Sequence, residues 1–438
     1  MHTRHRWLAT IFSLLYPGLG QWYNRQWLKG ALLTGLGACA WIYFGNHLFA
    51  AWRGLWTLGE TPSRFITIDD KLTHVPGDHS IQLLVKGLIV TILFAAYLAA
   101  HIANVKDAYR TGARRDSGRP VGSFAGTLRH VHDTKFAQVL LTIPFAGILF
   151  LTVLPIIFMI LLAFTNYSSP NHLPPAQLVD WTGLDTFIQL FRMKNWSSTF
   201  VDVLVWTIIW TIAATATTFG GGMLVALVLH QKEIRLKGMW RTMIIIPYAV
   251  PQIISLLAMK MIFNGQFGPI NQYLGYFGLD KLPWLTDPLL AKATVVLVNM
   301  WIGMPISFLL ISGVLTAIPN DLYEAAKVEG AGRWTQFRQI TLPYVMLATA
   351  PILIMQFAGN FNNFNVIFLL TGGGPVNPDL QFAGHTDLLI TWLYKLTLNN
   401  SVYNMASAVG IIVFLFVASL SIWSYRRTKS FKDEEMIQ

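Results

Sequence analysis

The stretch that decides the fold is residues 318–343, which read IPNDLYEAAKVEGAGRWTQFRQITLP. It lies between two long apolar runs, 289–315 and 344–370. The stretch is too polar to cross a membrane and too regular for an ordinary loop. It therefore indicates a compact structure at one membrane face, joining two membrane-spanning helices.

Residue types within the stretch predict its shape. Asn320 or Asp321 can cap a helix. Gly330 and Gly332 supply a break where the backbone can turn, and a second short helix over Arg333 to Ile340 follows. Pro343 then begins the next span, at a helix position where proline is tolerated. We expect two short helices that meet at a sharp angle.

Two roles fit such a structure equally well on physical grounds. Small side chains allow a partner protein to approach closely, and Glu324, Glu329, Arg333 and Arg338 can form ion pairs with it. An amphipathic interfacial helix that only links two spans is the alternative.

Composition places the chain in a membrane. Of the 438 residues, 54% are hydrophobic and 12% are charged, and the mean hydropathy is +0.48. Soluble domains carry about 25% charged residues. Apolar runs of about 20 residues are long enough to cross roughly 30 Å of hydrocarbon.

We predict an all-α polytopic membrane protein with about eight transmembrane helices. The predicted spans are 30–52, 83–103, 138–163, 200–228, 242–262, 289–315, 344–370 and 403–424. A further apolar stretch, 8–22, is short and broken by Pro17-Gly18, so we expect it to be re-entrant or interfacial.

The net charge of +11 raises the question of nucleic acid binding, but retention of Lys and Arg on the cytoplasmic side explains it better. Basic residues gather in 104–136, in 231–241 and after Arg426. These segments share one side if the spans alternate, which predicts that both termini are cytoplasmic. The basic N-terminus lacks a small-residue cleavage site, so we expect it to be retained.

The spacing of the spans suggests four regions. Residues 1–103 form an accessory membrane region with two helices, and 104–136 form a basic cytoplasmic linker. Residues 137–425 form a six-helix core, and 426–438 form a cytoplasmic tail.

A polar stripe runs through the span 344–370. Gln356, Asn360 and Asn363 would share one helix face. An aromatic stripe lies beside it, formed by Phe357, Phe361 and Phe364. Amides and aromatic rings suit a neutral polyhydroxylated solute, and the middle of this span carries no charged residue. Hydrogen bonding between helices is the alternative role for these amides.

Two other spans carry candidates for the same path. Grouped by face, these are Asn299, Gly303 and Ile306 on 289–315, and Tyr248 and Gln252 on 242–262.

The sequence lacks the residue patterns that ATP hydrolysis and metal binding require. The chain has no G-x-x-x-x-G-K-[ST] phosphate loop, so any ATP hydrolysis would be performed by a partner. Cys39 is the one cysteine. The histidines His101, His130 and His132 are too dispersed for a recognisable metal site. We therefore expect no enzyme activity and no metal.

The stretch 318–343 resembles the EAA loop of bacterial ABC importer permeases. The resemblance rests on Glu324-Ala325-Ala326, on Gly330 four residues after Ala326, and on Ile340-Thr341-Leu342-Pro343. It implies the type I six-helix permease fold over 137–425 and a coupling helix that docks on an ATP-binding subunit. The residues implied in coupling are Glu324, Ala325, Ala326, Gly330, Arg333, Leu342 and Pro343.

Other runs resemble the maltose/maltodextrin permeases: Pro247-Tyr248-Ala249-Val250-Pro251, Phe361-Asn362-Asn363-Phe364, Leu370 to Pro375, and Thr386 to Leu389. The resemblance implies a sugar path lined by Tyr248, Gln252, Asn299, Ile302, Gly303, Ile306, Gln356, Gly359, Asn360 and Asn363.

The chain departs from the best-known maltose subunit at several of these positions. Ile306 and Gly359 replace aromatic residues, and Gln252 and Gln356 replace serines. The loop 164–199 is much shorter. The N-terminal stretch from Pro17 to Asn24 resembles Gram-positive oligosaccharide permeases, including those for galacto-oligosaccharides.

Together these features predict a permease subunit in a bacterial cytoplasmic membrane that imports an oligosaccharide, with maltodextrin the first candidate and a galacto-oligosaccharide the alternative. The implied partners are a second permease subunit, ATP-binding subunits, an extracellular solute-binding protein and the lipid bilayer. The chain itself would bind no cofactor, because ATP and Mg would sit on the ATPase. A secondary transporter would need midplane carboxylates, and a membrane enzyme would need convergent His, Asp or Glu; neither pattern is evident.

Overall fold

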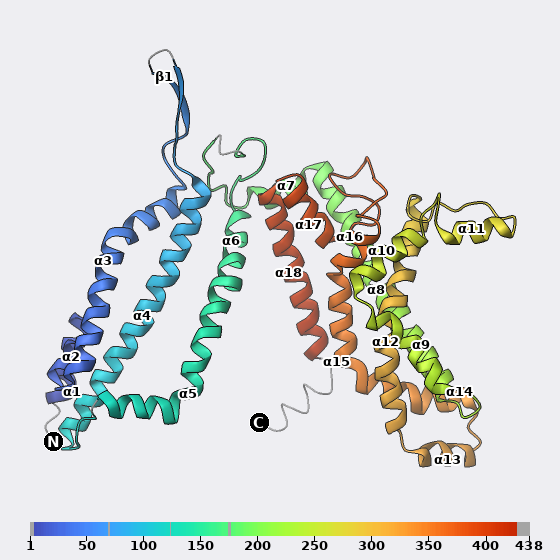
Figure 1. Ribbon diagram of the computed structural model, residues 1–438, viewed down its shortest axis with the longest axis horizontal. Helices are drawn as coiled ribbons and strands as arrows, with labels where there is room; N and C mark the ends of the chain where they lie inside the picture. The colour runs from blue at the N-terminus through green and yellow to red at the C-terminus, as the bar shows by residue number, and fades with distance from the viewer. Residues whose placement is uncertain (1–3, 69–70, 123, 174–176, 427–438) are drawn as a thin grey trace. The chain divides into compact units, whose positions relative to one another are not determined.

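The computed structural model describes residues 4–68, 71–122, 124–173 and 177–426 (Figure 1). Seven described helices are long and apolar enough to cross a membrane, and an eighth span arises if one bent helix pair is counted as a single span. The prediction of an all-helical protein with about eight spans is confirmed. The chain forms two compact units, Met1–Gly183 and Leu184–Gln438, which are treated separately below.

Unit 1 contains a helical hairpin, two long helices joined by a β-hairpin, and a further long helix. In chain order its elements are α1 (Arg4–Leu15), α2 (Leu19–Tyr23), α3 (Trp27–Thr57), β1 (Arg64–Ile68), β2 (Lys71–Val75), α4 (Ser80–Asp116), α5 (Phe124–Ile148), the π-helical turn η1 (Leu149–Val153) and α6 (Leu154–Leu162). The strands β1 and β2 pair antiparallel, with Arg64 opposite Val75.

Helices α1 and α2 form a hairpin that packs against α4. The hairpin begins at the end of α4, where the Asp116 carboxylate accepts a hydrogen bond from the His5 backbone N–H (2.9 Å). A second contact lies further toward the N-terminus of α4, where the Gln21 side chain donates a hydrogen bond to the Asn104 backbone carbonyl (3.2 Å). A Cβ on Gly20 would lie 2.2 Å from the Ala9 carbonyl oxygen, so only glycine allows this close approach. The stretch 8–22 is not among the candidate spans, and its re-entrant or interfacial position stays a prediction.

Unit 2 contains the remaining elements. They are α7 (Asp185–Arg192), α8 (Lys194–His230), α9 (Lys237–Ala249), α10 (Gln252–Ile262), α11 (Pro269–Tyr276), α12 (Pro288–Ala317), α13 (Asn320–Val328), α14 (Arg333–Gln336), η2 (Phe337–Thr341), α15 (Leu342–Phe361), α16 (Phe364–Leu370), α17 (Leu389–Tyr394), η3 (Lys395–Asn399) and α18 (Tyr403–Arg426).

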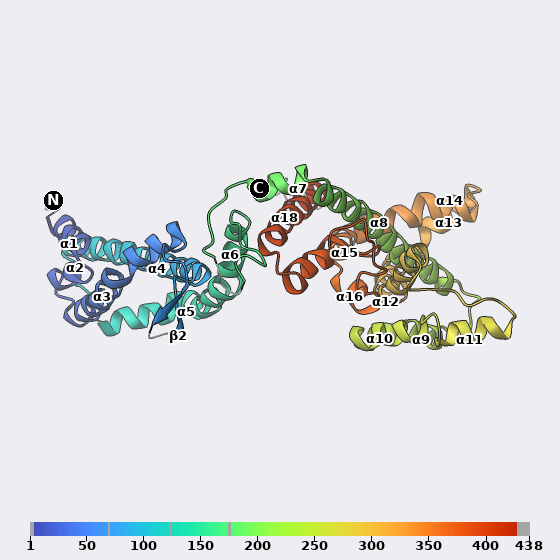
Figure 2. The same ribbon diagram turned by 90° about the horizontal axis from the view of Figure 1, so that it is seen from above.

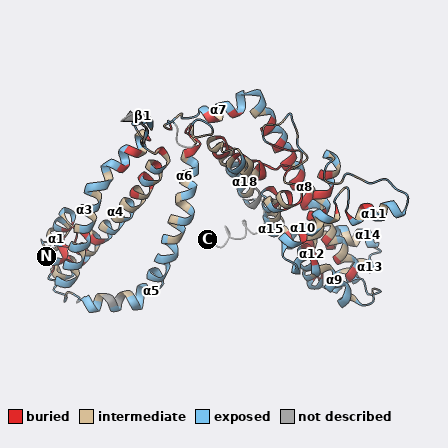
Figure 3. Cartoon of the chain, turned by 45° about the horizontal axis from the view of Figure 1, so that its top comes forward, coloured by how far each residue is buried: buried red, intermediate tan, exposed pale blue. Residues whose placement is uncertain are grey.

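The centre of unit 2 is the helix pair α8 and α12, which lie side by side (Figures 1 and 2). Figure 3 shows buried residues along α8, whereas α5 in unit 1 is largely exposed. Exposed apolar faces are expected for helices that contact lipid.

Two predicted segments differ in the structure. The linker predicted over 104–136 is largely helical, because α4 continues to Asp116 and α5 starts at Phe124. The compact units divide at Gly183, so residues 137–162 fall in unit 1. The division into four regions stays a prediction, and the predicted tail after Arg426 lies outside the described residues.

The predicted span 242–262 is broken. Helices α9 and α10 are bent by 96° around Val250 and Pro251. Val250 is extended (φ −86°, ψ 134°), as expected for a residue that precedes proline. The expectation that Tyr248 and Gln252 share one face of a continuous helix is therefore wrong.

A second break falls in the amide stripe. Helix α15 ends at Phe361, and α16 starts at Phe364. The Asn363 side chain accepts a hydrogen bond from the Val366 N–H (3.3 Å), so it caps α16. Asn363 therefore does not continue the helix face of Gln356 and Asn360, as the sequence predicted.

A buried carboxylate holds the segment between α16 and α17. Asp387 is fully buried; it accepts hydrogen bonds from the Gly384 N–H (2.7 Å) and the Thr391 hydroxyl (2.9 Å). The Lys395 ammonium forms an ion pair with it. Burial raises the pKa of Asp387, and the neighbouring Lys395 ammonium opposes the shift.

Candidate functional site

A cavity of about 880 Å³ opens in unit 2 between α8, the α9–α10 break, α12, α15 and α16. The structure brings all ten residues of the predicted sugar path to its wall: Tyr248, Gln252, Asn299, Ile302, Gly303, Ile306, Gln356, Gly359, Asn360 and Asn363. Its volume lies within the range of roughly 300–1,000 Å³ that is usual for ligand sites.

The cavity wall is polar but uncharged. None of the described residues that line it is Asp, Glu, Lys or Arg. Its polar groups are amides and hydroxyls, which both donate and accept hydrogen bonds. A neutral, hydroxyl-rich solute matches this wall, whereas an ion would meet no counter-charge.

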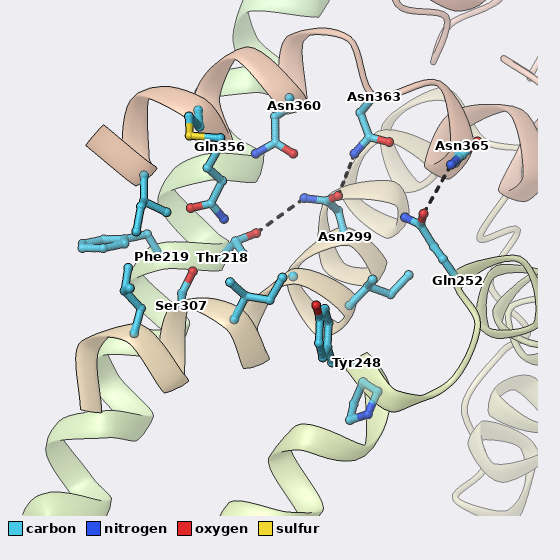
Figure 4. A pocket seen from close by; sticks show the side chains of 18 of the residues that line it. Thr218, Phe219, Tyr248, Gln252, Asn299, Ser307, Gln356, Asn360, Asn363 and Asn365 are labelled. Atoms are coloured by element: carbon cyan, nitrogen blue, oxygen red, sulfur yellow. Dashed lines mark hydrogen bonds between the residues drawn. The ribbon is translucent and has the colours of Figure 1, made fainter. Parts of the chain in front are cut away.

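A chain of hydrogen bonds crosses the cavity wall between three helices (Figure 4). The side-chain amide of Asn363 donates to the side-chain oxygen Oδ1 of Asn299 (3.0 Å), and the side-chain amide of Asn299 donates to the Thr218 hydroxyl (3.5 Å). These bonds tie the start of α16 to α12 and α8. Asn299 and Asn363 therefore position helices as well as lining the cavity.

Asn360 is committed to helix packing. It is buried, and its amide donates to the Thr215 hydroxyl (3.0 Å). Its backbone carbonyl accepts the Trp210 indole N–H (2.9 Å). For Asn360 the alternative role of interhelical hydrogen bonding therefore applies.

Other polar side chains are available to a ligand. Gln356 and Tyr248 point toward the cavity (Figure 4), and neither side chain has a recorded hydrogen bond to another described residue. Gln252 is bonded to Asn365, which donates to its carbonyl oxygen (3.3 Å) across the α10–α16 contact. Gln356 and Tyr248 are thus the best placed to bind a solute hydroxyl.

The remaining predicted path residues shape the cavity. A Cβ on Gly303 would lie 2.7 Å from the Thr218 Cγ2, so Gly303 lets α12 approach α8. At Gly359 an added Cβ would meet nothing within 4 Å, which leaves space in the cavity. Ile302 is partly buried in the core, and Ile306 is exposed.

The cavity wall also contains residues that were not predicted from the sequence. Thr218, Ser307, Asn362 and Asn365 also line the wall. The two asparagines belong to the same asparagine-rich run as Asn363 and could have been found there. Thr218 carries no sequence signal, because only its contact with Asn299 reveals it.

The predicted coupling segment forms a compact projection at one end of α12 and α15. Helix α13 carries Glu324, Ala325 and Ala326, and the chain turns at Gly330 (φ +82°). Neither predicted cap is used, because Pro319 occupies the cap position of α13 without a side-chain hydrogen bond. The three other predicted coupling residues begin the next helices: Arg333 is the first residue of α14, and Leu342 and Pro343 are the first two of α15.

The projection is anchored at its base. The Tyr323 hydroxyl and the Thr341 hydroxyl are hydrogen bonded (2.9 Å), which ties α13 to the start of the next span. The second predicted helix is continuous with that span, because α14, η2 and α15 follow without a gap. The Tyr323–Thr341 hydrogen bond therefore links α13 to the helical segment that leads into α15.

Two apolar side chains on this segment were not anticipated. Val328 is 89% exposed and Trp334 is 71% exposed. The described residues contain no group of three or more His, Cys, Asp or Glu that could hold a metal ion.

Comparison with known proteins identifies the family of the chain. Residues 219–429 match the family model "Binding-protein-dependent transport system inner membrane component". The chain is 41% identical to the galactooligosaccharides transport system permease protein GanP of Bacillus subtilis, over 98% of this chain and 100% of that protein. It is 35% identical to the maltodextrin transport system permease protein MdxF of the same organism, over 99% and 98%.

Among solved structures, the chain resembles a bacterial ABC transporter involved in the import of the acidic polysaccharide alginate. The TM-score is 0.56 at 21% identity, over 69% of this chain and 98% of that chain. At this identity the likeness shows the permease fold alone.

The chain therefore belongs to the binding-protein-dependent ABC importer permeases of the carbohydrate type. It is a multi-pass inner-membrane transport subunit without a catalytic role, and members of this family carry no cofactor of their own. Such permeases work in a complex with an ATPase and a binding protein.

Proposed function

We propose that this chain conducts a neutral oligosaccharide through the cavity between α8, α12 and α15. The observation that carries the proposal is the uncharged cavity wall, where Gln356 and Tyr248 face the cavity without recorded protein partners. Amide and phenol groups can bind sugar hydroxyls, and the aromatic ring of Tyr248 can cover the apolar face of a sugar ring.

The particular sugar is the finer part of the proposal. Maltodextrin is the sugar predicted from the sequence, and a maltodextrin permease is 35% identical to this chain. A galactooligosaccharide permease is 41% identical to it. The greater identity favours a galactooligosaccharide, and the departures at Gln252, Gln356 and Gly359 support a pocket unlike that of the best-known maltose subunit.

Coupling to ATP hydrolysis is proposed to occur at α13. Its exposed residues Glu324 and Ala325, together with Val328, would enter a groove of the ATP-binding subunit. Since α14 to α15 are continuous with the cavity wall, movement at α13 would reach Gln356. A second permease subunit would form the other half of the path, and both termini would lie in the cytoplasm.

The test is sugar uptake by proteoliposomes that contain the complete importer, with ATP inside. Labelled galactotriose and maltotriose are offered at equal concentration. We expect ATP-dependent uptake of one of them, with galactotriose preferred. Uptake of neither sugar, or uptake driven by an ion gradient without ATP, would overturn the proposal.

A further inference from the structure

Positive charge is concentrated at one end of unit 1. Residues 1–30 and 104–122 together contain nine Lys or Arg and two Asp, and no Glu. This excess of seven is most of the net charge of +11 that the whole chain carries. The N-terminal unit therefore holds a strong local positive field.

The fold brings these two distant stretches together. The backbone N–H of Arg6 donates to Asp116 (3.1 Å), and the Arg115 guanidinium donates to the Tyr23 carbonyl (2.7 Å). The Gln26 side chain reaches the carbonyl of Gly122 (3.1 Å). Both ends of the α1–α2 hairpin thus lie beside the end of α4.

Three of the nine basic side chains are engaged within the protein. Arg6 lies 3.8 Å from Asp116, and Lys29 forms an ion pair with Asp107 (2.8 Å). Arg115 bonds the Tyr23 carbonyl, as described above. The other six are exposed and have no recorded ion pair among the described residues: Arg4, Arg25, Lys106, Arg110, Arg114 and Arg119. These six residues are called the basic end below.

An exposed apolar face adjoins the basic end. Trp7, Ile11, Leu14 and Leu15 are each at least half exposed, and their spacing places them on one face of α1. The opposite face, with Ala9 and Ser13, is buried. Since α1 is too short to span the membrane, this apolar face can enter the hydrocarbon while Arg4 stays at the headgroup level.

We propose that the basic end binds the headgroups of anionic phospholipids in the leaflet that it faces. The proposal goes beyond sugar transport and gives the N-terminal unit a function. Complementary charge provides the attraction, and the adjoining apolar face fixes the depth at which the headgroups lie. A soluble anion would be attracted by the positive charge but would make no contact with the apolar face of α1.

The experiment is native mass spectrometry of the full-length chain in detergent, titrated with phosphatidylglycerol or with phosphatidylcholine of the same acyl chains. The test variant is Arg4→Gln/Arg25→Gln/Arg110→Gln/Arg114→Gln. The control variant, Lys232→Gln/Arg235→Gln/Lys237→Gln/Arg241→Gln, removes the same charge from the α8–α9 connection and the start of α9 in unit 2. A third variant places Lys at the four test positions and keeps their charge.

We expect the wild-type chain to prefer phosphatidylglycerol by at least tenfold, since each basic residue near an anionic surface contributes roughly fivefold. The four-Gln test variant should lose this preference, while the control and the four-Lys variant keep it. Equal binding of the two lipids by the wild-type chain, or an equal loss in the control variant, would overturn the proposal. Displacement of phosphatidylglycerol by glycerol 3-phosphate at equal concentration would assign the site to a free phosphate ester and overturn it as well.

Discussion

At the scale of single residues, the amides of the cavity fall into two groups. Asn360 and Asn299 are buried and bonded to hydroxyls on α8. Gln356 faces the cavity without a recorded protein partner. Buried polar groups need partners to be tolerated, so the first group is structural and the second can serve the solute.

Replacing Gln356 by leucine should weaken sugar transport without unfolding the protein. A lost hydrogen bond contributes about 1 kcal/mol, so we expect the KM for uptake to rise roughly two- to tenfold. The thermal midpoint in detergent should stay within about 2 °C of wild type.

Asn360→Leu is the matched comparison on the same helix. The substitution removes the hydrogen bond from the Asn360 side-chain amide to the buried Thr215 hydroxyl, and this loss lowers the free energy of unfolding by about 1–3 kcal/mol. We expect a lower thermal midpoint for this variant. If instead Gln356→Leu unfolds the chain and Asn360→Leu alters only the KM, the two roles are reversed.

Asp387→Asn should destabilise the protein. Removal of one partner of a buried ion pair leaves the Lys395 ammonium uncompensated, and we expect a loss of about 3 kcal/mol. Thermal unfolding monitored by tryptophan fluorescence measures the loss. Asp379→Asn, an exposed change in the same segment, should leave the midpoint unchanged. Equal midpoints for the two variants would rule out a stabilising role for the Asp387 pair.

At the scale of elements, breaks in helices create the functional geometry. The bend at Pro251 brings the chain between α9 and α10 to the cavity, and the break before Asn363 turns its amide toward Asn299. The turn at Gly330 separates α13 from the span that follows.

Gly330→Ala should weaken coupling to the ATPase. An alanine there meets no steric neighbour, but its left-handed backbone costs roughly 1–2 kcal/mol. We expect co-purification of the ATPase to fall about 5- to 30-fold in apparent affinity. Gly332→Ala is the control, because Gly332 also has open space but φ is −68°. Identical behaviour of the two variants would contradict a conformational role for Gly330.

Gly20→Val should destabilise the α1–α2 hairpin. The new side chain would collide with the Ala9 carbonyl, and overpacking of this kind costs about 1–3 kcal/mol. Limited proteolysis of the N-terminal unit should become faster. Gly35→Val on α3, where an added Cβ has no neighbour within 4 Å, should not change the rate. Equal rates for both variants would argue against close packing at Gly20.

Much of the helical order was predictable, because apolar runs of span length and basic connecting segments follow from hydropathy and charge alone. The bend near Pro251 and the break at Asn362–Asn363 were missed, since helical periodicity does not show where a helix stops. The sequence also indicated which amides matter. It could not separate Asn360 from Gln356, because the partners Thr215 and Trp210 lie about 150 residues away along the chain.

At the scale of the whole molecule, the chain consists of two compact units, Met1–Gly183 and Leu184–Gln438. Unit 2 carries both the cavity and the α13 projection, joined through the continuous helices α14, η2 and α15. Unit 1 carries the basic end and no part of the cavity wall. Sugar passage and lipid contact can therefore be tested on separate sets of residues.

The most direct test of the central claim, that the oligosaccharide occupies the cavity, is thiol labelling of Gln356→Cys in the reconstituted importer. Cys39, the one cysteine of this chain, lies within the candidate membrane span α3 and is replaced by serine, and Asp379→Cys, an exposed position outside the cavity wall, serves as the control. Saturating transported sugar should slow labelling at position 356 several-fold and leave the labelling at position 379 unchanged. Unchanged labelling at position 356, in an importer that still transports the sugar, would contradict the account.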